Sequence, residues 1–293
     1  MADTIIELPK AHPPPHVLEV LGASGELPIC VTCATQYPTP RKDYPRQWVP
    51  GSGQMWTFHG ALMAERKNEL LQDREDKRIY LIQTTPGFAI NQTPGSVIWD
   101  CAALLTPALA AWLLNLERPL KAIAISHPHQ FFSTSLMWSR ALKVPLYING
   151  TDRTWFRRAS DIDADDRVEF WVGTKQLLPN VRLYQCGGHF PGSSVLHWDR
   201  DAEPDADSLT KGGLLLTADT IMVQADRRGF TFIWSAPNWV LREHKVKFRQ
   251  ASSTWPHRFI RENADQVFES SVEKYLAKIG WKEEGEKLVP LKR

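Results

Sequence analysis

The stretch KAIAISHPHQ, residues 121–130, decides how the rest of the chain is interpreted. Its apolar residues 122–125 predict a buried β-strand, and Pro128 predicts that this strand has ended, because proline cannot donate a hydrogen bond to a sheet. In extended backbone the side chains at i and i+2 point to the same side, so His127 and His129 can reach one point in space. The two residues form either part of a metal site or a hydrogen-bonded structural pair.

Composition limits the class of protein. The chain has 293 residues, 35 basic and 33 acidic, with a formal net charge of +2, so we expect no nucleic-acid partner. The start carries Asp3 and Glu7 and does not have the pattern of a secretory signal, and the apolar run 102–116 is too short to cross a bilayer. Four cysteines in so long a chain predict no disulfide framework. We therefore expect a cytoplasmic protein that binds no membrane.

The order of expected elements predicts an α/β protein. Residues 1–57 are rich in proline and are predicted to form an N-terminal extension of a domain that spans residues 58–293. Within the extension, Cys30 and Cys33 are either half of a zinc-binding motif or two ordinary thiols. Strands and helices alternate, which suits sheets covered by helices. We expect strands at 78–83, 96–99, 122–125, 144–148, 168–172, 181–186, 195–198, 213–217 and 230–234, and helices at 59–76, 101–117, 133–142, 151–157 and 264–280; the polar residues after 280 are expected to be a solvated end.

Two more stretches place candidate ligands directly after strands. His189 lies in the glycine-rich loop GGHFPGSS, and Asp219 lies in LLLTADT. Taken singly, a histidine beside glycines is most often a loop hydrogen-bonding residue, and an aspartate after a strand is most often a turn cap. The set is harder to explain in this way, because several separate strand ends each present a metal-ligating side chain.

The ordered motifs resemble those of the metallo-β-lactamase-fold hydrolase superfamily. The resemblance runs from about Tyr80 to Trp234, and its motifs are SVIWD, SHPH, GGHFPG and LLLTADT. It implies a four-layer αββα sandwich with a metal between the strand-end loops. By the same resemblance, His127, His129 and His189 would bind the first metal, Asp219 would be the carboxylate that commonly bridges two metals, and Asp100 would support the site from below.

The chain also departs from the family pattern. Phe131 and Phe132 stand where the full motif His-x-His-x-Asp-His has its last two ligands, which favours one zinc ion over a dinuclear centre. His244 and His257 are candidates for a further histidine, but neither has a matching context. Some relatives carry a four-cysteine zinc ribbon ahead of the domain, so we interpret the region around Cys30 as a decayed one.

The ligand set predicts hydrolytic chemistry. Zinc held by three neutral imidazoles lowers the pKa of a bound water from about 15.7 to about 7, and the resulting hydroxide can attack an ester, lactone or lactam carbonyl of a small-molecule substrate. Asp219, the candidate catalytic residue, would either complete the coordination or orient the hydroxide and shuttle its proton. If Asp219 bound zinc tightly as a fourth protein ligand, the site would instead be closed and structural. Phe131, Phe132, Trp138 and Trp155 either form an aromatic pocket wall or pack in the core. The alternatives are a non-catalytic binding protein with this fold and a thioester or glyoxalase-type hydrolase.

Overall fold

The computed structural model describes the central part of the chain almost continuously and its two ends in segments. The described residues are 14–17, 19, 28–30, 48–50, 55–58, 63–67, 77–83, 95–101, 105, 107–116, 118–128, 130–156, 158–201, 212–232, 247–254, 258–279, 281–284 and 287–290.

The first of the two main sheets has seven strands in sequence order. They are β3 (Met55–Phe58), β4 (Met63–Lys67), β5 (Lys77–Gln83), β6 (Ser96–Trp99), β7 (Leu120–Ala124), β8 (Leu146–Asn149) and β9 (Val168–Trp171). The β3–β6 neighbours are antiparallel, whereas β6, β7, β8 and β9 are parallel. Parallel neighbours need a crossover connection. Helices α2 (Pro107–Leu114) and α3 (Gln130–Leu142) provide the crossovers from β6 to β7 and from β7 to β8.

The second main sheet has six strands. They are β10 (Thr174–Leu178), β11 (Val181–Gln185), β12 (Ser194–Trp198), β13 (Leu214–Leu216), β16 (Gln250–Thr254) and β17 (Arg258–Ile260). All neighbouring pairs are antiparallel except β13 and β16, which are parallel. The hairpin of β14 (Ile221–Val223) and β15 (Phe230–Phe232) and the helix α5 (Ala264–Ile279) lie outside this sheet.

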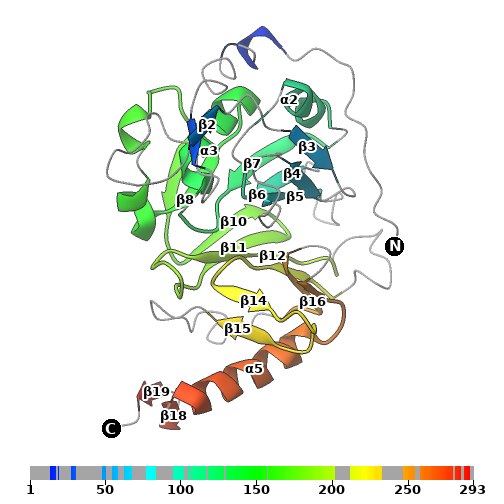
Figure 1. Ribbon diagram of the computed structural model, residues 1–293, viewed down its shortest axis with the longest axis vertical. Coiled ribbons are helices and arrows are strands. Elements are labelled where there is room, and N and C mark those ends of the chain that lie inside the picture. Colours follow the sequence, from blue (N-terminus) through cyan, green and yellow to red (C-terminus); the bar gives the residue numbers. More distant parts are fainter. Residues whose placement is uncertain are drawn as a thin grey trace.

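Alternating side chains build one core between the sheets and one on each outer side. Val97 and Trp99 of β6 pack against the second sheet, while Ile98 between them packs against α2 and α3. On the far side, Phe268 of α5 packs with the outer side chains of the second sheet. The layers therefore run helix, sheet, sheet, helix (Figure 1), and the predicted αββα sandwich is confirmed.

Most expected elements are present, with several corrections. The helix predicted at 59–76 is wrong, because β4 occupies Met63–Lys67. The predicted helix at 101–117 is shorter, at Pro107–Leu114, and the helical patch near 151–157 is the 3₁₀ helix η3 (Gly150–Trp155). Strands β10, β14, β16 and β17 were not predicted. The end after residue 280 contains a hairpin of β18 (Trp281–Glu284) and β19 (Lys287–Pro290), and β1 (Pro28–Cys30) pairs with β2 (Trp48–Pro50). The domain boundary at residues 57 and 58 stays a prediction.

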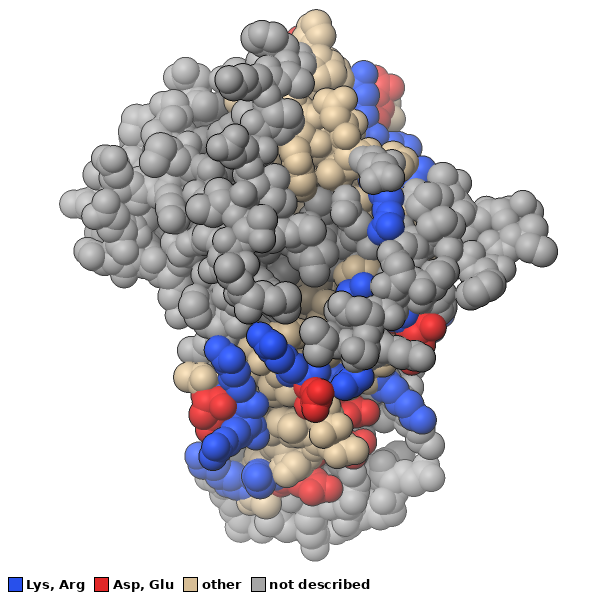
Figure 2. Space-filling model, turned by 90° about the vertical axis from the view of Figure 1, so that its right-hand side faces the viewer, with Lys and Arg blue, Asp and Glu red and all other residues tan. Residues whose placement is uncertain are grey.

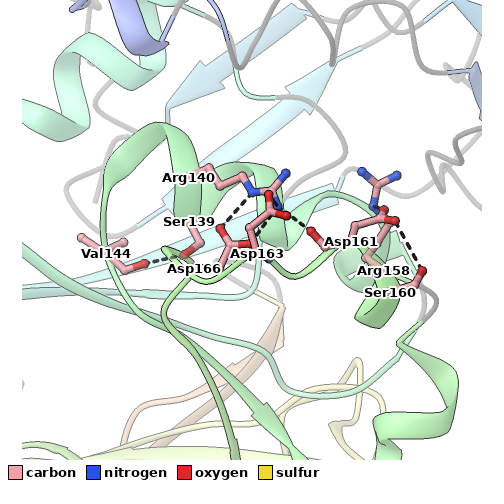
Figure 3. Close-up of polar contacts among 8 residues, drawn as sticks. All are labelled: Ser139, Arg140, Val144, Arg158, Ser160, Asp161, Asp163 and Asp166. Carbon is pink, nitrogen blue, oxygen red and sulfur yellow. Dashed lines mark hydrogen bonds and ion pairs between the residues drawn. The ribbon is translucent and has the colours of Figure 1, made fainter.

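The connection from β8 to β9 is fixed to α3 by polar contacts. The guanidinium of Arg140 donates to the carboxylates of Asp163 and Asp166 and to the carbonyl of Asp161, and Arg158 pairs with Asp161 (Figure 3). The short helix η4 (Ala159–Asp161) lies within this connection. The segment that follows η3 is therefore held against the first sheet's helical layer.

The described surface carries both signs of charge. Figure 2 shows Lys and Arg side chains interspersed with Asp and Glu on the lower part of one face. Among the described helices, none has the length and apolar character needed to cross a membrane.

Candidate metal centre

The candidate ligands meet because strands of both sheets end at one edge. Parallel strands share the edge at which their carboxyl ends lie, so Asp100 after β6 and His127 after β7 are neighbours there. In the second sheet β11 and β13 are both antiparallel to β12, so their ends also share an edge, followed by His189 and Asp219 respectively. The Ser194 amide at the start of β12 donates to the Ser126 carbonyl at 2.8 Å and joins the two sheets at this place.

Asp100 and Ser126 orient His127 through a buried chain of hydrogen bonds. The Ser126 amide donates to Asp100 Oδ1 at 2.7 Å, and the Ser126 hydroxyl donates to Asp100 Oδ2 at 2.9 Å. That hydroxyl lies 2.6 Å from His127 Nδ1. Because a serine has one hydroxyl proton, donation to Asp100 leaves its oxygen to accept from Nδ1–H. The lone pair of His127 is then on Nε2, the nitrogen that a metal would use.

The backbone of Asp100 is itself unusual. Its φ angle is 61°, in the left-handed region that few residues other than glycine adopt but that aspartate tolerates better than most. All three side chains are buried, with 5% of Asp100, none of Ser126 and 4% of His127 exposed. Burial raises the pKa of Asp100 to about 6, and the nearby His127 opposes this increase. Asp100 is therefore joined to His127 through Ser126, and its role in supporting a metal site stays a prediction.

The loop of His189 depends on its glycines. Gly187 and Gly188 have φ angles of 69° and 88°, which a residue with a Cβ adopts only with strain. The His189 amide donates to Thr220 Oγ1 at 3.3 Å, and the Thr220 hydroxyl donates to the Gly187 carbonyl at 2.9 Å. Thr220 follows Asp219, so these bonds tie the two ligand-bearing loops of the second sheet to each other. Burial lowers the pKa of His189, as does the nearby His127, which favours the neutral, ligating imidazole.

His127, His189 and Asp219 come together at this edge. Each offers one ligand atom such that all three atoms lie within 4.8 Å of one another. His127 Nε2 is 3.5 Å from Asp219 Oδ2, and the imidazole rings of His127 and His189 are 5.3 Å apart at 62°. Asp219 is 54% exposed, whereas His127 is almost fully buried. The cluster therefore has a closed side at the sheet edge and an open side at Asp219.

A second pair of buried polar residues supports the same loop and was missed by the sequence analysis. Asp152 of η3 accepts a hydrogen bond from the Gly192 amide at 2.8 Å through Oδ1. A Cβ at Gly192 would lie 2.6 Å from Asp152 Oδ2 and 2.6 Å from Asn149 Oδ1, so the loop fits here only with glycine. Burial raises the pKa of Asp152 to about 6, against the effects of the Gly192 amide and of His127. We call Asn149, Asp152 and Gly192 the loop latch.

Aromatic side chains line the cluster on another side. The Phe190 ring lies 4.5 Å from the His189 ring at 70° and 6.2 Å from the His127 ring at 27°. Trp155 meets Phe190 edge to face, with ring centres 5.3 Å apart. Trp138, predicted as an alternative wall residue, is fully buried in the core between the first sheet and its helices. Trp138 therefore packs in the core and does not line the site.

Several predicted site residues cannot be placed. His129, His244, His257 and Cys33 lie outside the described residues, as do the side chains of Cys30, Phe131 and Phe132. Of the four predicted ligands, the structure therefore brings His127, His189 and Asp219 together, and the role of His129 stays a prediction.

Comparison with known proteins gives a sequence relative that spans most of the chain. No family model matches the chain. The uncharacterized protein YmaE of Bacillus subtilis (strain 168) is 33% identical over 276 residues, which cover 85% of this chain and 95% of YmaE. Nearly the whole length of YmaE is therefore shared.

The solved structures that match include metallo-β-lactamases at low identity. The enzyme from Erythrobacter litoralis is 12% identical with a TM-score of 0.48, over 75% of this chain and 96% of that one. The one from Pontibacter korlensis is 13% identical with a TM-score of 0.44, over 76% and 97% of the two chains. Because these sequence identities and TM-scores are low, the fold is described from this chain's own sheets and layers.

Proposed function

We propose that this chain, which belongs to the same family as YmaE and has the metallo-β-lactamase fold, is a metal-dependent hydrolase of small carbonyl compounds. The observation that carries the proposal is the convergence of His127, His189 and Asp219 at one sheet edge, with ligand atoms within 4.8 Å of one another. The substrates proposed are esters, lactones and lactams.

The three side chains fit a zinc ion. Tetrahedral zinc with bonds of about 2.1 Å has ligand atoms roughly 3.4 Å apart, so a pair at the 4.8 Å limit would need to close by no more than about 1.4 Å. His127 Nε2 and Asp219 Oδ2, which are 3.5 Å apart, already have this spacing, so the adjustment involves His189, whose side chain is half-buried in its loop. Two imidazoles and one carboxylate are a ligand set that zinc commonly takes in catalytic sites, with one position left for water. One zinc ion per chain is proposed because Phe131 and Phe132 occupy the places of the second-metal ligands.

When bound, zinc would polarise the substrate carbonyl and lower the pKa of a water molecule to about 7. The chain's own residues would do the rest. Asp100 and Ser126 hold His127 in the tautomer with Nε2 unprotonated. The carboxylate of Asp219, on the open side, can take up the proton of the attacking water and deliver it to the leaving group. Proton transfer through Asp219 is therefore part of the proposed mechanism.

A non-catalytic binding protein is the second candidate. It is favoured by Phe131 and Phe132, because neither side chain can hold a metal ion or a water molecule. The same fold and a single metal would then serve to bind a ligand without turnover.

The test is metal analysis together with hydrolysis of an ester, lactone, lactam and thioester panel. The hydrolase proposal predicts zinc-dependent turnover that His189→Ala abolishes. The control is His16→Ala. His16 bonds to the carbonyl of Ala141 near the C-terminal end of α3, whereas the site lies beside the N-terminal end of this helix, so the variant should retain activity. Stoichiometric zinc without turnover of any substrate would favour the binding protein, and turnover that survives His189→Ala would refute the proposed site.

A further inference from the structure

Trp155 is exposed to a degree that calls for an explanation. It is 52% exposed, and among the described residues the other large apolar side chain with such exposure is Val172, at 63%. Isolated apolar side chains on a surface are ordinary and need no ligand. Trp155 is different because Phe190 joins it to the candidate metal centre.

The aromatic contacts are continuous from solvent to both imidazoles. The Phe190 ring packs edge to face on His189, nearly parallel to His127, and edge to face on Trp155. A flat group lying against Trp155 and Phe190 would thus be adjacent to the side chains proposed to hold the metal. We call Trp155 and Phe190 the aromatic platform.

Hydrogen bonds fix the two segments that carry the platform. Gln185, the last residue of β11, donates through Nε2 to Thr151 Oγ1 at 3.2 Å and to the Pro191 carbonyl at 3.0 Å. Its Oε1 accepts from the Gly173 amide at 2.9 Å, which holds the Gln185 side chain in place. Thr151 belongs to the same 3₁₀ helix as Trp155, and Pro191 follows Phe190. The loop latch adds a second tie between the same two segments.

Such fixed rings favour binding because little conformational freedom remains to be lost. Aromatic side chains bind other aromatic groups through edge-to-face or offset-stacked contacts in addition to apolar burial. Of the cations near Trp155 that the structure describes, Arg153 lies over the ring of Phe170, 4.6 Å from its centre, and Arg158 pairs with Asp161. These features suit a neutral aromatic group better than an anionic one.

We propose that the aromatic platform is the specificity-determining surface of the site and binds an aromatic ring on the acyl side of the substrate. The inference rests on the proposed hydrolase function for its biological meaning, but the platform itself can be tested by binding alone. The substrate class that we infer is neutral carbonyl compounds with an aromatic acyl group.

The experiment compares two zinc-binding probes that differ only in the ring. Benzohydroxamic acid and cyclohexanecarbohydroxamic acid carry the same metal-binding group on a flat aromatic or a puckered aliphatic ring. Their affinities for the zinc-loaded protein are measured by calorimetry for the wild type, Trp155→Ala, Trp155→Phe and Val172→Ala. Zinc per chain and circular dichroism check that each variant is folded and loaded.

The platform predicts about tenfold tighter binding of the aromatic probe by the wild type. Trp155→Ala should remove most of that preference while changing the affinity of the aliphatic probe less than threefold. Trp155→Phe should restore most of the preference, and Val172→Ala should leave it intact. An equal loss for both probes, or no loss for either, would overturn the proposal.

The two proposals fail separately. If the protein prefers the aromatic probe through Trp155 but hydrolyses nothing in the panel, the hydrolase function is refuted and the platform stands. If it hydrolyses esters and Trp155→Ala changes neither ring preference in binding nor the relative rates for aromatic and aliphatic acyl groups, only the platform is refuted.

Discussion

Removal of one hydroxyl, in Ser126→Ala, should weaken zinc binding without touching a ligand. The hydroxyl lies 2.9 Å from Asp100 Oδ2 and 2.6 Å from His127 Nδ1, and all three residues are buried. The variant removes the hydroxyl partner of two buried groups, the acceptor Asp100 Oδ2 and the donor His127 Nδ1. Each such loss costs about 1–3 kcal/mol of unfolding free energy. Because Asp100 keeps the bond from the Ser126 amide at 2.7 Å, we expect a total loss in unfolding free energy of about 3 kcal/mol.

The effect on metal affinity follows from the same bonds. Without the hydroxyl, His127 loses the partner that fixes its ring and its tautomer. Loss of such a supporting contact typically costs about 10–100-fold in metal affinity. Competition with a chromogenic chelator measures the zinc dissociation constant, and urea unfolding of the metal-free protein measures stability.

Ser135→Ala is the matched control. Ser135 is also a fully buried serine, on α3, but its hydroxyl has no hydrogen-bond partner in the described part of the chain. Its replacement should leave zinc affinity unchanged and stability unchanged or slightly raised, because an unsatisfied polar atom is removed. Zinc affinity of Ser126→Ala within twofold of the wild type would refute the orienting role of the Asp100–Ser126–His127 chain.

Two further predictions concern the loop latch. Gly192→Ala places a Cβ 2.6 Å from oxygens of both Asn149 and Asp152. The variant should therefore lose about 1–3 kcal/mol of stability in urea unfolding, and it should bind zinc more weakly because His189 is displaced. Unchanged stability and unchanged zinc affinity would mean that the loop accommodates a side chain. Asp152 has a folded-state pKa of about 6 against an ordinary 3.8, so its neutral form stabilises the fold fully below about pH 4, and this stabilisation is lost as pH rises through 6. The loss in unfolding free energy is at most about 3 kcal/mol. Asp152→Asn should therefore flatten the stability–pH curve of the metal-free protein between about pH 4 and 6, although Asp100 will still contribute a slope of the same sign. An unaltered curve would contradict the burial of an ionisable Asp152.

The motifs at strand ends could be predicted because their chemistry is local. An apolar run that stops at Ser126 and a proline at 128 are enough to place His127 at the end of a strand. The glycines before His189 predict the bend that their positive φ angles provide. That these ends meet at one edge followed from the family resemblance rather than from spacing along the chain.

Other features depend on tertiary contacts and left no clear signal. Met63–Lys67 has a helix-compatible composition, yet it is a strand because β5 pairs with it in the sheet. Asp152 resembles an ordinary helix-start residue in NGTDRTW, and only the approach of Gly192, forty residues later, gives it a partner. The sequence places Phe190 in a loop motif but does not predict its contacts with Trp155 and His127, because these contacts join separate segments.

The most direct measurement is the number of zinc ions per chain, determined by elemental analysis of purified protein dialysed against trace zinc. The proposed centre of His127, His189 and Asp219 predicts one zinc ion per wild-type chain and less than about a tenth of that in His189→Ala at the same free zinc concentration. A wild-type protein without bound metal, or a His189→Ala variant that keeps its zinc, would contradict the account.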